Sequence, residues 1–210
     1  MTIHLTFVCA PGGDATLDPF LGDAPLTERG LRAARATAIP LPAHGLVVRA
    51  PSVRCAQTAD ALGLTAVPEP ALCDLVIGGW AGRTIGRIAA TDPHGLSAWL
   101  TDPDATPHEG ESVRGLCRRT GDWLTSLAGG TGDVVAITEA AVVRAALVHA
   151  LATSARSFWH LTVPPLSAVS FSWRNGWWDV RREDVTAQRD PRWLLPRAAT
   201  VPPQEMLPVS

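Results

Sequence analysis

The chain has 210 residues and a mass of 22.2 kDa, a size that suits one domain. Apolar residues make up 46% and charged residues 18%, so the chain can bury a sizeable core and is not disordered throughout. The net charge is −2, and this balance gives no basic excess that would point to nucleic acid or an anionic membrane. All 18 basic residues are Arg, which excludes a Schiff-base lysine and a Walker-type phosphate loop.

The four cysteines, at positions 9, 55, 73 and 117, form no Cys-x-x-Cys pair and no zinc-binding spacing with histidine. The N-terminal segment has no positively charged region before an apolar run, so it does not fit a secretory signal peptide. We therefore expect a cytoplasmic protein with reduced thiols, with no metal, no cofactor and no membrane-spanning segment.

Short apolar runs bounded by glycine and proline predict alternating strands and helices in the first half of the chain. Thr27 has a side chain suited to cap the first helix. The expected elements are a strand over 3–9 with a glycine-rich turn over 10–13, a loop over 14–26, a helix over 28–37, a strand over 45–50, a helix over 53–62, an irregular stretch over 64–82, and short helical pieces over 85–100 that break at 93–95.

The second half is predicted to hold an amphipathic helix, an apolar strand with a buried helix after it, and a hairpin. The hairpin signal is Asn175-Gly176 between two runs of alternating residues. The expected elements are a loop over 101–110, a helix over 112–127, a strand over 133–138, a helix over 140–151, and hairpin strands over 167–173 and 177–182. We expect one domain over 1–190 and a Pro-rich C-terminal extension over 191–210.

This alternation predicts a three-layer α/β/α fold with a mainly parallel central sheet. Ligands of such sheets bind beyond the carboxyl ends of the strands. Two strands pass straight into small-residue turns, at Cys9-Ala10-Pro11 and at Thr138-Glu139-Ala140. If those strands are neighbours, Cys9 and Glu139 face one crevice.

Five segments, in order along most of the chain, resemble motifs of the histidine phosphatase superfamily, which has the phosphoglycerate-mutase-like fold. Any one of them is a weak signal, but five in order with plausible spacing make a strong one. They are Pro25–Gly30 (PLTERG), Ser52–Ala59 (SVRCAQTA), Leu72–Gly82 (LCDLVIGGWAG), Gly110-Glu111-Ser112, and Asp133–Leu147, which resembles the family's strand-Thr-His-Gly-helix segment.

The catalytic residues of that family are not matched. The family has Arg-His-Gly after its first strand, where this chain reads Cys9-Ala10-Pro11, so the phosphorylated histidine falls on Ala10. The second histidine falls on Glu139, and the family's acid falls on Asp74. Of the two arginines and two histidines of the family, only the position of Arg54 is kept.

This resemblance implies that the phosphatase reaction is lost. Phosphoryl transfer in that family needs an imidazole nucleophile and a cationic cradle for phosphate, and alanine cannot attack. A carboxylate at position 139 repels phosphate by about 4 kcal/mol at ~4 Å and an effective dielectric of ~20.

The candidate catalytic residues are Glu139, Asp74 and His108. Glu139 suits a general base at a strand end, although a solvated loop Glu or one that favours a helix N-terminus has the same sequence. Asp74 suits a second acid/base or a turn cap. His108 precedes a segment that resembles the family's lid and could shuttle a proton, with an exposed loop His as the alternative.

The candidate substrate-binding residues are Arg54, Cys9, Ala10 and Trp80. Arg54 could hold an anionic or carbonyl oxygen, or form a surface ion pair. Cys9 could line the site or act as a nucleophile, but small buried cysteines are usually inert. Trp80 could be structural. A site of Ala, Pro, Cys and Glu suits an apolar or aromatic substrate better than a sugar phosphate.

Three functions from different classes remain open. The first is an enzyme in which Glu139 deprotonates a carbonyl substrate, such as a cyclase or isomerase of natural-product biosynthesis. The superfamily resembles, in one such use, the ring-forming cyclases of bacterial carbazole-alkaloid pathways, with which the missing imidazoles and Glu139 are compatible. The second is a catalytically dead pseudo-phosphatase that acts as a binding module, and the third is a weak residual phosphatase. The expected partner is a small-molecule substrate, and the oligomeric state is open between monomer and homodimer.

Overall fold

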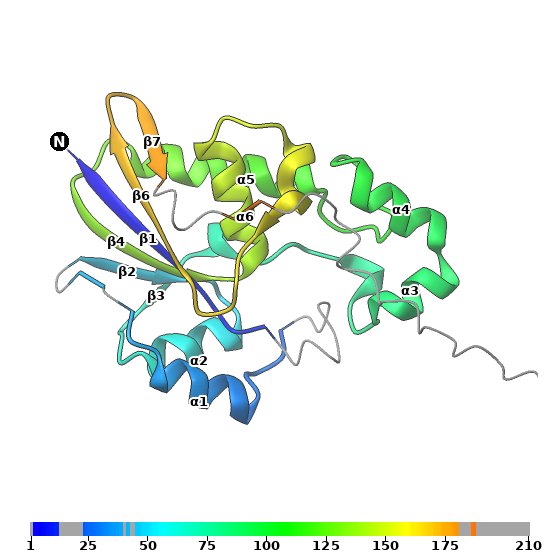
Figure 1. The fold of residues 1–210 in the computed structure, drawn as a ribbon, viewed down its shortest axis with the longest axis horizontal. Coiled ribbons are helices and arrows are strands. Elements are labelled where there is room, and N and C mark those ends of the chain that lie inside the picture. Colours follow the sequence, from blue (N-terminus) through cyan, green and yellow to red (C-terminus); the bar gives the residue numbers. More distant parts are fainter. Residues whose placement is uncertain (1, 13–22, 40, 43–44, 181–185, 188–210) are drawn as a thin grey trace, which may run out of the picture.

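A computed structural model describes residues 2–12, 23–39, 41–42, 45–180 and 186–187. Within these residues the central element is a six-stranded sheet with the strand order β3-β2-β4-β1-β6-β7 (Figure 1). Its first four strands are parallel, β6 is antiparallel to β1, and β7 is antiparallel to β6, which confirms a mainly parallel sheet. The strands are β1 (Ile3–Cys9), β2 (Leu46–Arg49), β3 (Val67–Pro68), β4 (Gly132–Thr138), β6 (Ala168–Arg174) and β7 (Trp177–Val180).

Helices cover both faces of this sheet, so the fold has three layers. Helices α1 (Glu28–Ala36) and α2 (Val53–Ala61) lie on one face, and α5 (Val113–Leu127) and α6 (Ala140–Ala150) lie on the other (Figure 1). Thr27 caps α1 as predicted, because its hydroxyl accepts a hydrogen bond from the backbone N–H of Gly30 at 3.1 Å. Ser112 caps α5 in the same way, from Gly115.

The register of the parallel strands brings their carboxyl ends together. Cys9 at the end of β1 pairs with Thr138 at the end of β4. The N–H of Ala10 continues this ladder by donating to the carbonyl of Thr138 at 2.8 Å, and the N–H of Ala50 after β2 donates to Ile137. Residues that follow β1, β2 and β4 therefore meet at one edge of the sheet.

The predicted hairpin is present, and its turn explains its sequence. Asn175 and Gly176 both have positive φ, of 51° and 87°, which is the backbone that a two-residue hairpin loop requires. The expected strand residues 181–182 lie outside the described residues, as does the predicted C-terminal extension over 191–210. A second, two-stranded sheet pairs β5 (Leu161–Thr162) with β8 (Thr186–Ala187).

The structure corrects two sequence predictions. The break in the 85–100 region lies at Asp92, which caps α4 (Pro93–Thr101) after α3 (Ile85–Thr91), so Pro93 begins a helix. The stretch over 64–82 was expected to be irregular, but it contains β3 and the 3₁₀ turns η1 (Pro70–Leu72) and η2 (Gly78–Trp80). A two-residue strand that ends in proline gives no alternating pattern, so the sequence does not reveal it. A further 3₁₀ segment, η3 (Ala155–His160), precedes β5.

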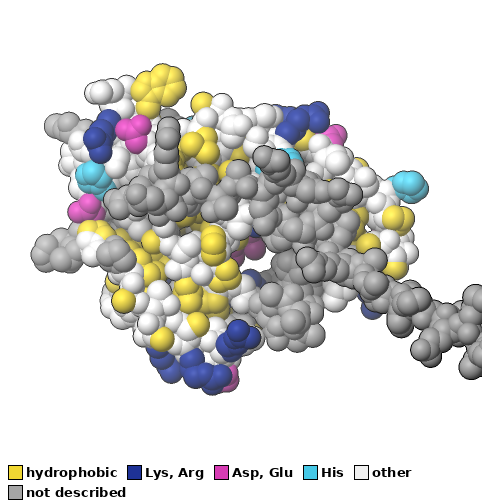
Figure 2. Space-filling model, in the orientation of Figure 1, with side chains coloured by type: hydrophobic (Ala, Val, Ile, Leu, Met, Phe, Trp, Pro, Cys, Tyr) yellow, Lys and Arg dark blue, Asp and Glu magenta, His cyan; other side chains and the backbone are white. Residues whose placement is uncertain are grey.

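No helix among the described residues is long and apolar enough to cross a membrane. On the face drawn in Figure 2, basic side chains lie in separate groups, and one group lies over α1, where Arg32 is exposed.

Candidate active site

Glu139 lies between β4 and α6 and is buried, with 6% of its surface exposed. It occupies the N-cap position of α6, yet its side chain makes no capping hydrogen bond there. Instead, the Ser52 hydroxyl donates a hydrogen bond of 2.5 Å to Glu139 Oε1. The alternative of a solvated loop Glu is therefore wrong, because the carboxylate is held inside the protein by a partner from another element.

Asp74 reaches the same edge of the sheet through a link between β4 and the loop after η1. The Thr138 hydroxyl donates to the carbonyl of Leu72 at 2.8 Å and so holds this loop against the strand end. The half-buried Asp74 carboxylate accepts a hydrogen bond from the N–H of Leu75. Burial, together with the negative charge of Glu139, raises the pKa of Asp74 to about 7.

Arg54 lies in the first turn of α2 and has 8% of its surface exposed. Its positive charge acts on Asp74 and opposes the rise of that carboxyl's pKa. Two buried thiols lie beside these charges. Burial raises the pKa of Cys9 to about 12, and burial and Glu139 raise the pKa of Cys55 still further above its usual range.

Arg144 of α6 belongs to this site, and sequence reasoning missed it. It is buried with 9% of its surface exposed, and burial lowers its pKa. Its Nε donates to the carbonyl of Leu161 at 2.9 Å, and its charge acts on Cys9 and Asp74. The signal was an arginine within the apolar helix sequence AAVVRAALVHA, because an arginine inside a buried helix needs polar or charged surroundings.

We call these residues the strand-end cluster. It combines two carboxylates, two guanidinium groups, one hydroxyl and two thiols around the end of β1, where Ala10 is also buried. Such a set can move a proton between carboxylates and can hold an oxyanion on arginine. Its members are Cys9, Ala10, Ser52, Arg54, Cys55, Asp74, Glu139 and Arg144.

His108 and Trp80 belong to a second group, which we call the aromatic cluster: Trp80, Trp99, His108, Phe158 and Trp159. His108 has 1% of its surface exposed, so the alternative of an exposed loop histidine is wrong. The centroid of its ring lies 5.2 Å from the centroid of the Trp80 ring and 6.1 Å from that of the Trp99 ring. Nδ1 accepts from the N–H of Gly110 at 3.0 Å, while Nε2 is buried and finds no hydrogen-bond partner among the described residues. Burial lowers the pKa of His108, which keeps it neutral.

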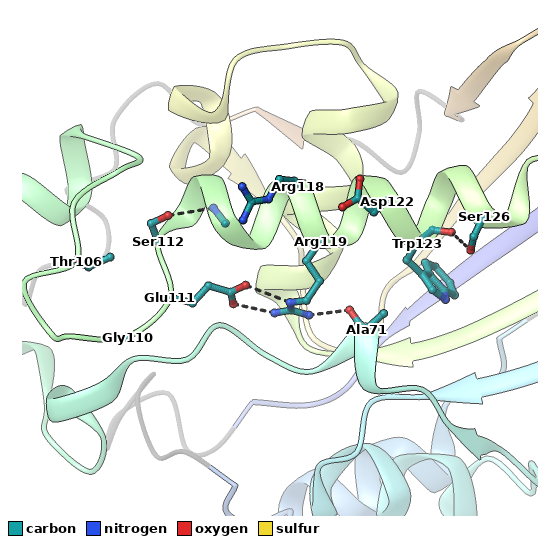
Figure 3. Close-up of a pocket in the computed structure, with 11 residues that line it drawn as sticks. Ala71, Thr106, Gly110, Glu111, Ser112, Arg118, Arg119, Asp122, Trp123 and Ser126 are labelled. Carbon is teal, nitrogen blue, oxygen red and sulfur yellow. Dashed lines mark hydrogen bonds and ion pairs between the residues drawn. The ribbon is translucent and has the colours of Figure 1, made fainter.

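A groove of about 810 Å³ runs along α5, and no residue of either cluster is among those that line it (Figure 3). Its walls include the ion pair of Arg119 with Glu111, in which the Nη2–Oε2 distance is 2.8 Å. Arg119 also donates to the carbonyls of Ala71 and Cys73, so it holds the segment that leads into Asp74. One wall of the groove is thus bonded to the segment that precedes Asp74.

No group of three or more His, Cys, Asp or Glu side chains that could hold a metal ion occurs in the part of the chain that the structure describes.

The comparisons with known proteins agree with this architecture. The family model of the histidine phosphatase superfamily (branch 1) matches residues 20–186, so the chain belongs to that superfamily. A curated relative, the bifunctional protein Rv2228c of Mycobacterium tuberculosis (strain ATCC 25618 / H37Rv), is 35% identical over 105 residues. That match spans 47% of this chain but only 29% of the relative.

Solved structures share the fold across nearly the whole chain. YhfR of Bacillus stearothermophilus superposes with a TM-score of 0.75 at 19% identity, over 88% of this chain and 98% of that one. The mycobacterial glucosyl-3-phosphoglycerate phosphatase Rv2419c superposes with a TM-score of 0.72 at 22% identity, over 90% of this chain and 100% of that one. At these identities the likeness concerns the fold alone.

Proposed function

We propose that this protein is a proton-transfer enzyme on the histidine phosphatase fold, with Glu139 as the general base. The observation that carries the proposal is the buried Glu139 carboxylate, which the Ser52 hydroxyl holds at 2.5 Å beside the end of β1. A positioned carboxylate in such a setting is equipped to remove a proton from a carbon acid.

Asp74 supplies the complementary acid. Because its pKa is raised to about 7, a large fraction of Asp74 keeps its proton at neutral pH and can return it to the substrate. Arg54 would hold the oxyanion that forms when Glu139 takes the proton, since its charge already acts on this site. The three residues together cover deprotonation, stabilisation of the anion and reprotonation.

Phosphoryl transfer has poorer support in the same cluster. Ala10 offers no nucleophile where the resemblance places the family's phosphorylated histidine, and Glu139 replaces the second imidazole with a group that repels phosphate. Cys9 is a poor substitute, because a pKa of about 12 leaves roughly one thiolate in 10⁵ at pH 7.

The surroundings favour an uncharged, flat substrate with an acidic C–H next to a carbonyl. Cys9, Ala10 and Cys55 are small and buried, and they give the reacting groups an apolar wall. Cyclisation and isomerisation both begin with such a deprotonation, and ring closure in natural-product biosynthesis, including carbazole formation, belongs to this class.

A weak residual phosphatase is the second candidate. The shared fold with a named phosphatase favours it, and so do Arg54 and Arg144, which could hold phosphate oxygens. A pseudo-phosphatase that binds without chemistry is the third.

One experiment separates the three functions. Elimination of 5-nitrobenzisoxazole needs only a positioned base, because loss of its C–H proton breaks the N–O bond and releases a coloured phenolate. We expect the wild-type protein to catalyse it, and Glu139→Gln to slow it by about 10²–10⁴-fold. Glu28→Gln, at an exposed helix position, is the matched control and should leave the rate unchanged.

The same preparations are assayed for hydrolysis of p-nitrophenyl phosphate and 3-phosphoglycerate. Turnover above about 1 per second would favour the phosphatase and overturn the proposal. No elimination in the wild type, or an equal rate in Glu139→Gln, would also overturn it and leave the binding module.

A further inference from the structure

The Ser52 hydroxyl joins two elements of the site at one atom. It donates to Glu139 Oε1 at 2.5 Å, and it accepts from the N–H of Cys55 at 3.3 Å as the N-cap of α2. Helix α2 carries Arg54 two residues after Ser52. The base and the arginine are therefore tied to each other through a single hydroxyl group.

The two bonds of this hydroxyl differ in length, and the difference shows which partner dominates. The hydroxyl caps of helices α1 and α5 make shorter capping bonds, 3.1 Å at Thr27 and 3.0 Å at Ser112, whereas the cap of the 3₁₀ segment η3 at Ser154 has 3.3 Å. At Ser52 the capping bond is the longer one, while its bond to Glu139 falls in the range of charge-assisted O–H···O⁻ bonds, ~2.5–2.7 Å. The Ser52 hydroxyl therefore binds the Glu139 carboxylate more strongly than it caps helix α2.

The second oxygen of Glu139 is left available for a proton. Thr138 Oγ1 lies 3.5 Å from Glu139 Oε2, but the same hydroxyl donates to the carbonyl of Leu72 at 2.8 Å. A hydroxyl has one hydrogen, so the shorter bond takes it. Within the described residues, Ser52 fixes Oε1, and the other group that hydrogen-bonds this carboxylate is the Cys55 thiol, which is a much weaker donor than a hydroxyl.

We propose that Ser52 is a positioning residue for the proton transfer, which holds Glu139 through Oε1 so that Oε2 faces the substrate C–H at a fixed distance from Arg54. This inference rests on the proposed function of Glu139 as the base. A misplacement of about 1 Å in a reacting group can cost ~10²-fold in rate. Loss of the Ser52 hydroxyl should therefore act on turnover more than on stability.

The test measures 5-nitrobenzisoxazole elimination and thermal stability for variants of the full chain. We expect Ser52→Ala to lower kcat by about 10–100-fold with little change in KM. Ser52→Gly also removes the hydroxyl, but glycine is better tolerated than alanine at an N-cap, so this variant keeps the test valid if Ser52→Ala folds poorly. Ser52→Thr keeps a hydroxyl and should retain a rate within about threefold of wild type.

Thr27→Ala is the matched control, because it removes the cap of a helix outside the strand-end cluster. It should lower stability through the loss of a helix cap alone and leave the elimination rate unchanged. Rates within twofold of wild type for Ser52→Ala or Ser52→Gly, or a threonine variant as slow as alanine, would overturn the inference. If Glu139→Gln alone is inactive in that case, the proposed base survives; if Glu139→Gln is also as fast as wild type, the proposed function itself fails.

Discussion

The strand-end cluster and the aromatic cluster each bury a titratable residue, yet they surround it in opposite ways. Glu139 has 6% of its surface exposed and lies among a hydroxyl and charged side chains, whereas His108 has 1% exposed and lies between indole rings. Burial is similar in both, so burial alone does not mark a site. What distinguishes the strand-end cluster is the set of polar groups that converge on one carboxylate.

The largest expected effect is on the aromatic cluster: removal of His108 should cost much stability and leave the elimination rate unchanged. His108→Ala leaves a cavity between Trp80 and Trp99, and we expect the free energy of unfolding to fall by about 3 kcal/mol. Urea unfolding measures this change. The elimination rate per folded molecule should stay within twofold of wild type, because no step of the proposed chemistry uses His108.

A loss of more than tenfold in that rate, with the fold intact, would return His108 to the chemistry as the proton shuttle that the sequence suggested.

Two arginines on α5 test whether the Asp74 loop needs a buried support. Each makes an ion pair with two hydrogen bonds, but their surroundings differ. Arg119 pairs with Glu111 and also donates to the carbonyls of Ala71 and Cys73, whereas Arg114 pairs with Asp104 in an exposed position. We expect Arg119→Ala to lower the free energy of unfolding by about 2 kcal/mol and to slow elimination, because it releases the loop that carries Asp74.

Arg114→Ala is the control on the same helix, and it should change neither the melting temperature nor the rate measurably, since exposed pairs contribute little. If the two variants behave alike, Arg119 has no special role in holding the Asp74 loop.

The sequence predicted best those parts of the molecule that backbone pairing determines. The strand ends at Cys9 and Thr138 could be expected to meet, because both follow apolar strands of a parallel sheet, and the register places them opposite each other. The cap at Thr27 and the turn at Asn175 follow from local chemistry, and the structure has both.

The parts that depend on loops could not be read in the same way. The place of His108 depends on the packing of a loop against Trp80 and Trp99, residues that lie 28 and 9 positions before it in the sequence. The lone arginine in the apolar sequence of α6 marks Arg144 as unusual but does not reveal what it contacts, and the Ser52–Glu139 bond joins residues 87 positions apart. Contacts of this kind follow from tertiary packing and leave no local pattern.

The smallest expected effect is the pH dependence of folding stability, which should have opposite signs for Asp74 and His108. Burial and Glu139 raise the pKa of Asp74 to about 7, so the folded protein holds a proton that the unfolded chain loses near its ordinary value of about 4. Between those values the folded state binds more protons, and the stability therefore falls as the pH rises from about 4 to about 7. His108 acts in the opposite direction: burial lowers its pKa, so stability falls as the pH drops below about 6.5.

Asp74→Asn should therefore make the protein more stable by roughly 1–2 kcal/mol at pH 8 and leave its stability unchanged at pH 4, because asparagine removes the ionisation but keeps the size. Urea unfolding between pH 4 and pH 8 measures the difference. Asp104→Asn is the matched control: Arg114 lowers the pKa of this exposed carboxyl, so this variant should gain no stability at pH 8. A stabilisation by Asp74→Asn that is the same at pH 4 and pH 8 would show that Asp74 does not titrate in a buried site, and the proposed acid would have to be another group.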